Sequence, residues 1–148
     1  MSNEKHLELG KKFFNATWDL IDKTDRSDLD NLEMISLAHK SLYHWSFVGE
    51  PVNFARGEWQ ISRVFALINM GEAAMYHAKR SLSICLENNI GDFDLVFAYE
   101  AVARAANIVG KKNQALENIS KALELAENIS DEGNKNYALS EVNSIKID

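Results

Sequence analysis

The sequence contains few residues that interrupt helices. Its 148 residues include one proline and seven glycines, whereas alanine, leucine, glutamate and lysine are plentiful. Proline and glycine destabilise a helix interior more than other residues do, so their scarcity leaves long stretches free to form helices. Apolar residues make up 46% and charged residues 26% of the chain, as in an ordinary globular protein. We therefore expect an all-α fold in a single domain over residues 1–148.

Other absences narrow the class of protein. Cys85 is the only cysteine, so no internal disulfide can form, and its apolar neighbours predict a buried structural thiol. The formal net charge is −6 and no run of lysine or arginine exceeds two residues, which argues against nucleic acid as a partner. No apolar run approaches the roughly 20 residues of a membrane span, and the charged first residues lack a signal-peptide core. These features predict a cytoplasmic protein without a membrane partner.

The sequence also lacks the common catalytic and cofactor motifs. It contains no Gly-x-Ser-x-Gly, no phosphate-binding loop and no dinucleotide-binding fingerprint. Gly71, Gly91 and Gly110 are too scattered to cradle a phosphate and instead punctuate helices. We expect no cofactor. Catalytic groups need not be close in sequence, so an enzyme stays an open alternative.

Apolar residues at steps of three, four and seven predict seven helices. Gly49 suits the end of a helix, and Pro51 is tolerated only in a first turn, so one helix ends and the next begins there. The connectors are short, which forces consecutive helices to lie antiparallel and in contact. The expected helix pairs cover residues of about 4–47, 52–89 and 94–129, followed by a capping helix at about 132–146.

The chain resembles itself after a shift of 40 or 41 residues. The register holds across two helices and the turn between them, which chance similarity of two amphipathic helices does not explain. Self-similarity at such a period indicates stacked helix pairs, although an unrelated helical bundle is the alternative. The aligned positions are Ala74 with Ala115, Ala78 with Ile119, Leu82 with Leu123 and Arg63 with Arg104 at a shift of 41, and Ala38 with Ala78 and Ser41 with Ser81 at a shift of 40.

Residues 99–125 resemble a tetratricopeptide repeat. Tyr99 falls at the family's aromatic position, Gly110 at its inter-helix turn, and Ala115 and Ala122 at the two small residues of its second helix. The copy at residues 56–84 has Asn69 in place of the turn glycine. The period exceeds the family's common repeat length of about 34 residues. The chain is therefore similar to longer-repeat members, which include peptide-sensing bacterial regulators and motor-protein cargo adaptors, and to short bacterial proteins.

The resemblance implies a short right-handed superhelix with about three pairs and a capping helix. In that family the first helix of each pair lines a concave face that binds a protein or peptide segment. Residues at steps of three or four in those helices would share one stripe of this face. The expected groove residues are Phe97, Glu100, Arg104 and Asn107 and, in the preceding copy, Arg56, Trp59 and Arg63.

Paired arginines near exposed aromatic side chains would suit a carboxylate-bearing partner, such as a peptide C-terminus. Arg63 and Arg104 would lie in successive rows with Glu100 between them. The alternative is that Glu100 pairs with either arginine and neutralises the groove. Likewise, Trp59 would either contact a ligand or pack against a neighbouring helix.

Two further alternatives concern function. The first is a structural subunit that self-associates through the apolar ends of the stack, where Trp18, Trp45 or the last helix would be exposed. The second is a small metal-dependent enzyme or phosphoprotein-regulatory factor. The only metal-ligand set considered for it is His44, His77 and Glu58, brought together by tertiary contacts.

Overall fold

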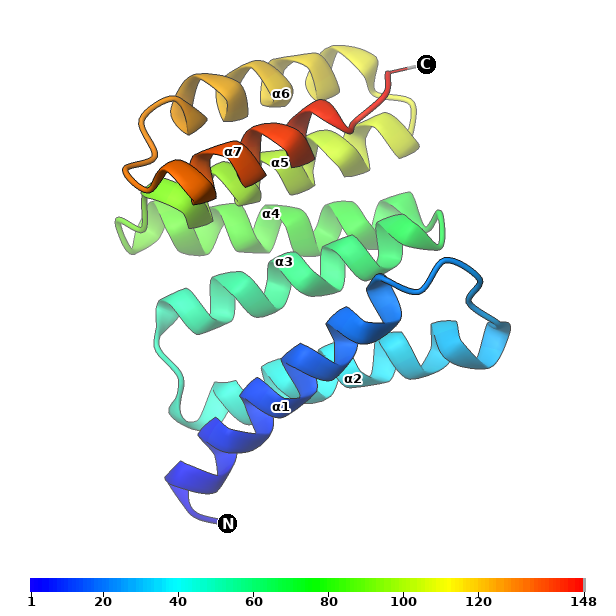
Figure 1. The fold of residues 1–148 in the computed structure, drawn as a ribbon, viewed down its shortest axis with the longest axis vertical. Helices are drawn as coiled ribbons and strands as arrows, with labels where there is room; N and C mark the ends of the chain where they lie inside the picture. Colours follow the sequence, from blue (N-terminus) through cyan, green and yellow to red (C-terminus); the bar gives the residue numbers. More distant parts are fainter. Residues whose placement is uncertain (148) are drawn as a thin grey trace.

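The computed structural model describes residues 1–147, and these form seven α-helices joined by short connectors (Figure 1). Adjacent helix pairs pack against each other, which confirms the expected all-α fold of stacked pairs. None of the described helices is both long enough and apolar enough to span a bilayer. The helices are α1 (Asn3–Ile21), α2 (Asp28–Val48), α3 (Pro51–Leu67), α4 (Gly71–Glu87), α5 (Asp92–Ile108), α6 (Lys112–Ala126) and α7 (Glu132–Asn143).

Local side-chain chemistry sets several helix starts. Ser27 caps α2 in a reciprocal capping box with Asp30. Asp131 accepts a hydrogen bond from the amide of Asn134 at the start of α7. Pro51 occupies the first turn of α3, as expected from its fixed φ.

The turns that end α3 and α5 repeat the same geometry 41 residues apart. Asn69 has φ 62° and Gly110 has φ 81°, so both adopt the left-handed conformation. In each turn the amide of the following residue donates to the carbonyl five residues before it, at 2.9 Å. Asparagine enters this region more readily than other residues with a Cβ, which explains how Asn69 replaces a glycine.

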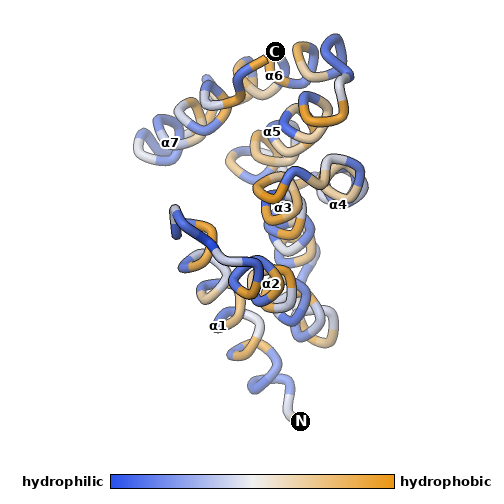
Figure 2. The backbone as a smooth tube through the Cα atoms, turned by 90° about the vertical axis from the view of Figure 1, so that its right-hand side faces the viewer, coloured by the Kyte–Doolittle hydropathy of each residue, from blue (hydrophilic) through white to orange (hydrophobic). Residues whose placement is uncertain are grey.

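The three pairs stack in chain order. α1 packs on α2, α3 on α4 and α5 on α6, while α2 contacts α3 and α4 contacts α5 to join the layers. α3 and α5 also contact each other directly. Figure 2 shows α1 and α7 on one side of α3 and α5, with α4 on the opposite side. The first helices of the pairs therefore line one face, and α7 extends its rim.

Small residues allow the helices of a pair to approach closely. The Ser41 hydroxyl donates to the Gly10 carbonyl at 2.7 Å, and the Ser81 hydroxyl makes the corresponding bond to the Ala55 carbonyl at 2.9 Å. Ala122 is completely buried at the third equivalent position, without a hydroxyl. The repeat found in the sequence therefore corresponds to equivalent packing positions in the structure.

The tryptophans do not form an exposed end of the stack. Trp45 is 7% exposed because its indole lies over Gly10 in the α1–α2 contact. Trp18 is half-buried and packs against the aliphatic core from the inner side of α1. The expectation that either residue marks an exposed apolar end is therefore wrong.

The close α1–α2 contact predicts that Gly10→Ala destabilises the fold. A Cβ at residue 10 would lie 2.5 Å from Trp45 Nε1, well inside normal contact distance. We expect the free energy of unfolding to fall by about 1–2 kcal/mol, because overpacking outweighs the gain in helix propensity. Urea unfolding followed by circular dichroism measures this change.

Gly91→Ala is the matched control. No atom lies within 4 Å of the added Cβ at this position, and its φ of −113° is accessible to alanine. Only a small loss of stability is expected for this variant, because Gly91 is the N-cap of α5 and alanine is less favourable than glycine there. Equal stability of the Gly10→Ala variant would contradict the tight α1–α2 packing.

Candidate functional site

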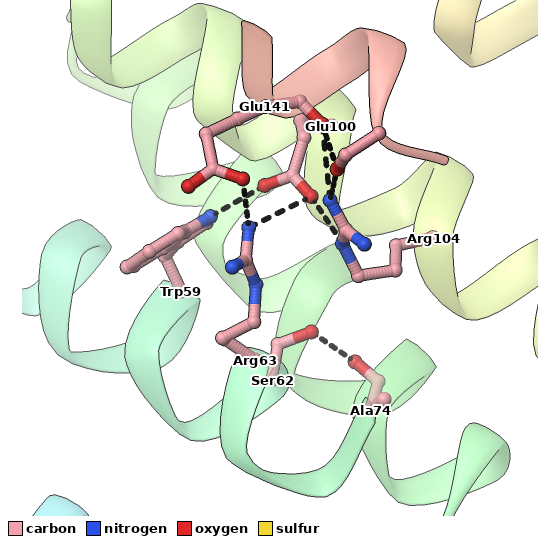
Figure 3. A network of polar contacts seen from close by, with 8 residues as sticks. Trp59, Ser62, Arg63, Ala74, Glu100, Arg104 and Glu141 are labelled. Atoms are coloured by element: carbon pink, nitrogen blue, oxygen red, sulfur yellow. Dashed lines mark hydrogen bonds and ion pairs between the residues drawn. The ribbon is translucent and has the colours of Figure 1, made fainter. Parts of the chain in front are cut away.

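A buried carboxylate lies at the centre of the concave face. Glu100 on α5 is completely buried and accepts a hydrogen bond from Trp59 Nε1 at 3.0 Å. Its other oxygen accepts bonds from Arg63 Nη2 at 3.3 Å and Arg104 Nε at 2.6 Å (Figure 3). Arg63 also lies over the Trp59 ring, 5.3 Å from its centroid. Two guanidinium groups thus neutralise one carboxylate through the same oxygen, Oε2.

The last helix joins this network. Arg63 Nη2 lies 3.6 Å from the Glu141 carboxylate on α7. Arg104 Nη2 donates to the Glu141 carbonyl at 3.1 Å and to the Ser144 hydroxyl at 3.0 Å. Asn107 donates to the Lys146 carbonyl at 2.8 Å. The C-terminal segment of the chain therefore accepts hydrogen bonds from Arg104 and Asn107, two side chains that the sequence analysis predicted would bind a peptide.

The structure brings most of the expected groove residues together, but it buries the aromatic side chains among them. Glu100 lies between Arg63 and Arg104, as the stacked register predicted, and it pairs with both. The expectation of exposed aromatic side chains is wrong, because Trp59 is 8% and Phe97 5% exposed. Helices α1 and α7 cover these rings from either side, and the repeat alignment contained no information on that closure.

A hollow of about 260 Å³ adjoins the buried carboxylate on the same face. Its walls come from α1, α3, α4, α5 and α7, and most of its lining is aromatic. Neighbouring rings lie in contact, with the Trp18 and Trp59 centroids 5.6 Å apart and those of Phe97 and Tyr137 5.7 Å apart. We call this site the aromatic hollow; its rings are Phe14, Trp18, Trp59, Phe93, Phe97 and Tyr137.

An ion pair forms the polar part of the aromatic hollow. Arg56 donates from Nε and Nη2 to the two oxygens of Asp94, at 2.9 and 3.0 Å. The hydrogen bond to Asp94 raises the pKa of Arg56 against the opposing effect of burial. The Arg56 side chain is nevertheless 49% exposed, so it remains accessible from solvent. On the opposite wall, burial and the neighbouring Glu141 carboxylate raise the pKa of the Tyr137 phenol.

Several residues of the aromatic hollow were not anticipated from the sequence. The third helix pair was expected to begin at about residue 94, but α5 begins at Asp92 and includes Phe93 as well as Asp94. The four-residue step from Phe93 to Phe97 could have placed both rings on one helix face. Tyr137 lies in the capping helix, for which the repeat offered no alignment.

The thiol behind this wall is unsuited to nucleophilic chemistry. Cys85 is completely buried, and its Sγ lies 3.9 Å from the Asp94 carbonyl. Burial, with a smaller contribution from the Asp94 charge, raises the pKa of Cys85 to about 11. The thiol is therefore protonated near neutral pH, in agreement with the structural role expected from its neighbours.

The histidines form two pairs, His6 with His44 and His39 with His77. His44 Nδ1 is 3.0 Å from His6 Nδ1 in the first layer. His77 contacts the Glu58 carboxylate at 3.2 Å, and Arg80 donates to the same carboxylate at 2.9 Å. Among the described residues, no group of three histidine, cysteine, aspartate or glutamate side chains is arranged to hold a metal ion. The predicted alternative of His44, His77 and Glu58 as one ligand set is therefore wrong, because His77 contacts Glu58 whereas His44 pairs with His6.

Comparison with known proteins found no family model, curated protein or solved structure that matches the chain.

The buried network predicts that Glu100→Gln destabilises the protein. A neutral amide would leave Arg63 and Arg104, which are 10% and 21% exposed, without their shared counter-charge. We expect a loss of about 3 kcal/mol in the free energy of unfolding, at the lower end for breaking a buried ion pair, since both guanidinium groups keep some water contact.

Urea unfolding monitored by tryptophan fluorescence and circular dichroism measures this loss. Glu117→Gln, on the exposed face of α6, removes the same charge outside the network and should leave the stability nearly unchanged. If both variants unfolded at the same urea concentration, the carboxylate would not be needed to hold the two arginines.

Proposed function

We propose that this chain is a tetratricopeptide-like binding module whose concave face holds a protein or peptide segment. The observation that carries the proposal is the aromatic hollow, an accessible cavity of about 260 Å³ walled by rings from α1, α3, α5 and α7. The proposed partner inserts one aromatic or large aliphatic side chain into it. Interface hot spots are commonly anchors of this type in desolvated pockets.

The size of the aromatic hollow supports a side-chain occupant. Sites for drug-sized molecules and cofactors usually measure about 300–1,000 Å³. A cavity slightly smaller than this range suits a single anchoring side chain, with the remainder of the segment lying across the concave face. Ring edges and faces in the walls offer the offset and edge-to-face contacts that favour an aromatic anchor.

The polar contact with a partner is assigned to Arg56. The arginines expected to hold a carboxylate, Arg63 and Arg104, already share Glu100 and contact α7. Arg56 lies beside the aromatic hollow and is half exposed, and its bonds to Asp94 use two of the five N–H donors of a guanidinium group. A carboxylate of the partner, placed beside the anchor, would therefore bind here.

The tetratricopeptide-like part of the proposal is supported by repeated details. Asn69 and Gly110 end the first helices of two pairs in the same left-handed geometry. Ser41 and Ser81 make equivalent hydrogen bonds in two second helices. Such correspondence is typical of stacked repeats, which commonly present an extended binding surface.

The proposal predicts that removing a ring from the wall of the aromatic hollow weakens peptide binding. Peptides would be selected on the wild-type protein from a displayed random library, and their affinities measured by fluorescence titration. Trp18 and Trp59 line the hollow, so binding should also change the tryptophan emission. Phe93→Ala and Tyr137→Ala should each weaken binding by at least tenfold, because a wall of the anchor site is lost.

Tyr76→Ala is the control, since Tyr76 is 62% exposed on α4 and lies outside the hollow. Melting temperatures of all variants separate loss of binding from loss of folding. In the same titration, Arg56→Ala should weaken the binding of acidic peptides several-fold and leave the binding of uncharged peptides unchanged. Undiminished binding by folded Phe93→Ala and Tyr137→Ala variants would refute the assignment of the anchor site.

A further inference from the structure

The outer side of α2 carries a stripe of exposed side chains that is apolar toward both ends of the helix, with Ser36 and Lys40 between the apolar residues. At about 100° per residue, the stripe lies on the side of the helix opposite the buried residues Met34, Ala38, Ser41 and Trp45. It runs nearly the full length of α2, from residue 29 to residue 47. We call it the α2 stripe; its apolar members are Leu29, Leu32, Tyr43 and Phe47, which are 77%, 63%, 59% and 54% exposed.

This pattern is unusual for a helix at the surface. A surface helix normally has one apolar face, whereas apolar residues on opposite faces are typical of a helix buried on both sides. α2 belongs to the first layer of the stack (Figure 1) and packs against α1 and α3. Within residues 1–147, no other helix packs against α2. The stripe borders α1 at its C-terminal end, where Phe47 stacks on His6 with ring centroids 4.3 Å apart, but each of its apolar residues remains more than half exposed and could contact a further helix.

We propose that the α2 stripe is the contact surface for a second copy of this chain, with the two α2 helices antiparallel about a two-fold axis. The stripe is complementary to itself in that arrangement. An axis beside residue 38 places Leu29 opposite Phe47 of the second copy, and Leu32 opposite the turn that carries Tyr43. The leucine end of each stripe thus contacts the aromatic end of the other stripe, as an isologous contact requires.

Charge at the centre of the stripe fits the same register. Ser36 faces Lys40 of the second copy across the axis, and the small serine allows the helices to approach. Glu33 lies on the border of the stripe, three residues from Ser36, within reach of the same lysine. Two symmetric Lys40–Glu33 pairs would form, one on each side of the axis. Lys40 now lies 5.8 Å from the Phe13 ring centroid and is exposed.

The dimer would leave the proposed peptide site open. None of the residues that line the aromatic hollow comes from α2. The stripe extends over 19 residues, or about 27 Å of helix. A single helix pair of this length is at the low end of specific interfaces, so the association should be weak and reversible. Failure of peptide binding and failure of dimerisation would therefore be separate observations.

Sedimentation equilibrium over a concentration series tests the proposal. The wild-type protein should show a reversible monomer–dimer equilibrium. In a Leu32→Glu/Tyr43→Glu double variant, the dissociation constant should rise at least tenfold, because a charge would be buried at each end of the contact. Leu86→Glu, at a 55% exposed position on α4, is the control and should associate like the wild type. A wild-type monomer at all concentrations, or association that survives the double substitution, overturns the proposal.

A charge exchange tests the antiparallel register. Lys40→Glu should weaken the dimer several-fold because it opposes Glu33 of the second copy. Adding Glu33→Lys to the same chain should restore the wild-type dissociation constant, since the pair forms again with reversed charges. Both positions are exposed, so circular dichroism should show unchanged helix content. If the second substitution fails to restore association, the register is refuted.

Discussion

The concave face depends on the neutralisation of one buried carboxylate. Glu100 has no contact with water, and an isolated charge there would be strongly unfavourable. Donors from α3 and α5 remove that cost, and the same two arginines reach the backbone and carboxylate of α7. Because hydrogen bonds to a carboxylate are directional and strong, this network fixes how α3, α5 and α7 lie relative to one another. The position of Tyr137 in the wall of the aromatic hollow follows from it.

The same neutralisation changes which residues suit recognition. Two arginines around one carboxylate, with Glu141 nearby, present little net charge to a partner. What remains accessible is an apolar cavity with one half-exposed guanidinium group, that of Arg56. Recognition by shape and aromatic contact, with one ionic contact beside it, fits this surface better than recognition by paired arginines.

Sequence periodicity predicted the helices and their stacking because both depend on local patterns. Ser41 and Ser81 align in sequence and make the same hydrogen bond in space, and Asn69 aligns with Gly110 in the same turn geometry. The meeting of Arg63, Glu100 and Arg104 also followed from this register. The aromatic hollow did not, because it depends on how far the stack curves. That curvature brings α1 and α7 over Trp59 and Phe97, residues whose exposure no single repeat determines.

The first layer has a different role from the two that follow. In the second and third layers the first helices meet directly through Glu100, whereas α1 contacts α3 through Trp18 against Trp59 and through the bond from Gln60 to the Phe14 carbonyl, and its rings close the aromatic hollow. The inner side of the first layer thus closes the proposed peptide site, whereas the outer side of α2 presents the proposed dimer contact.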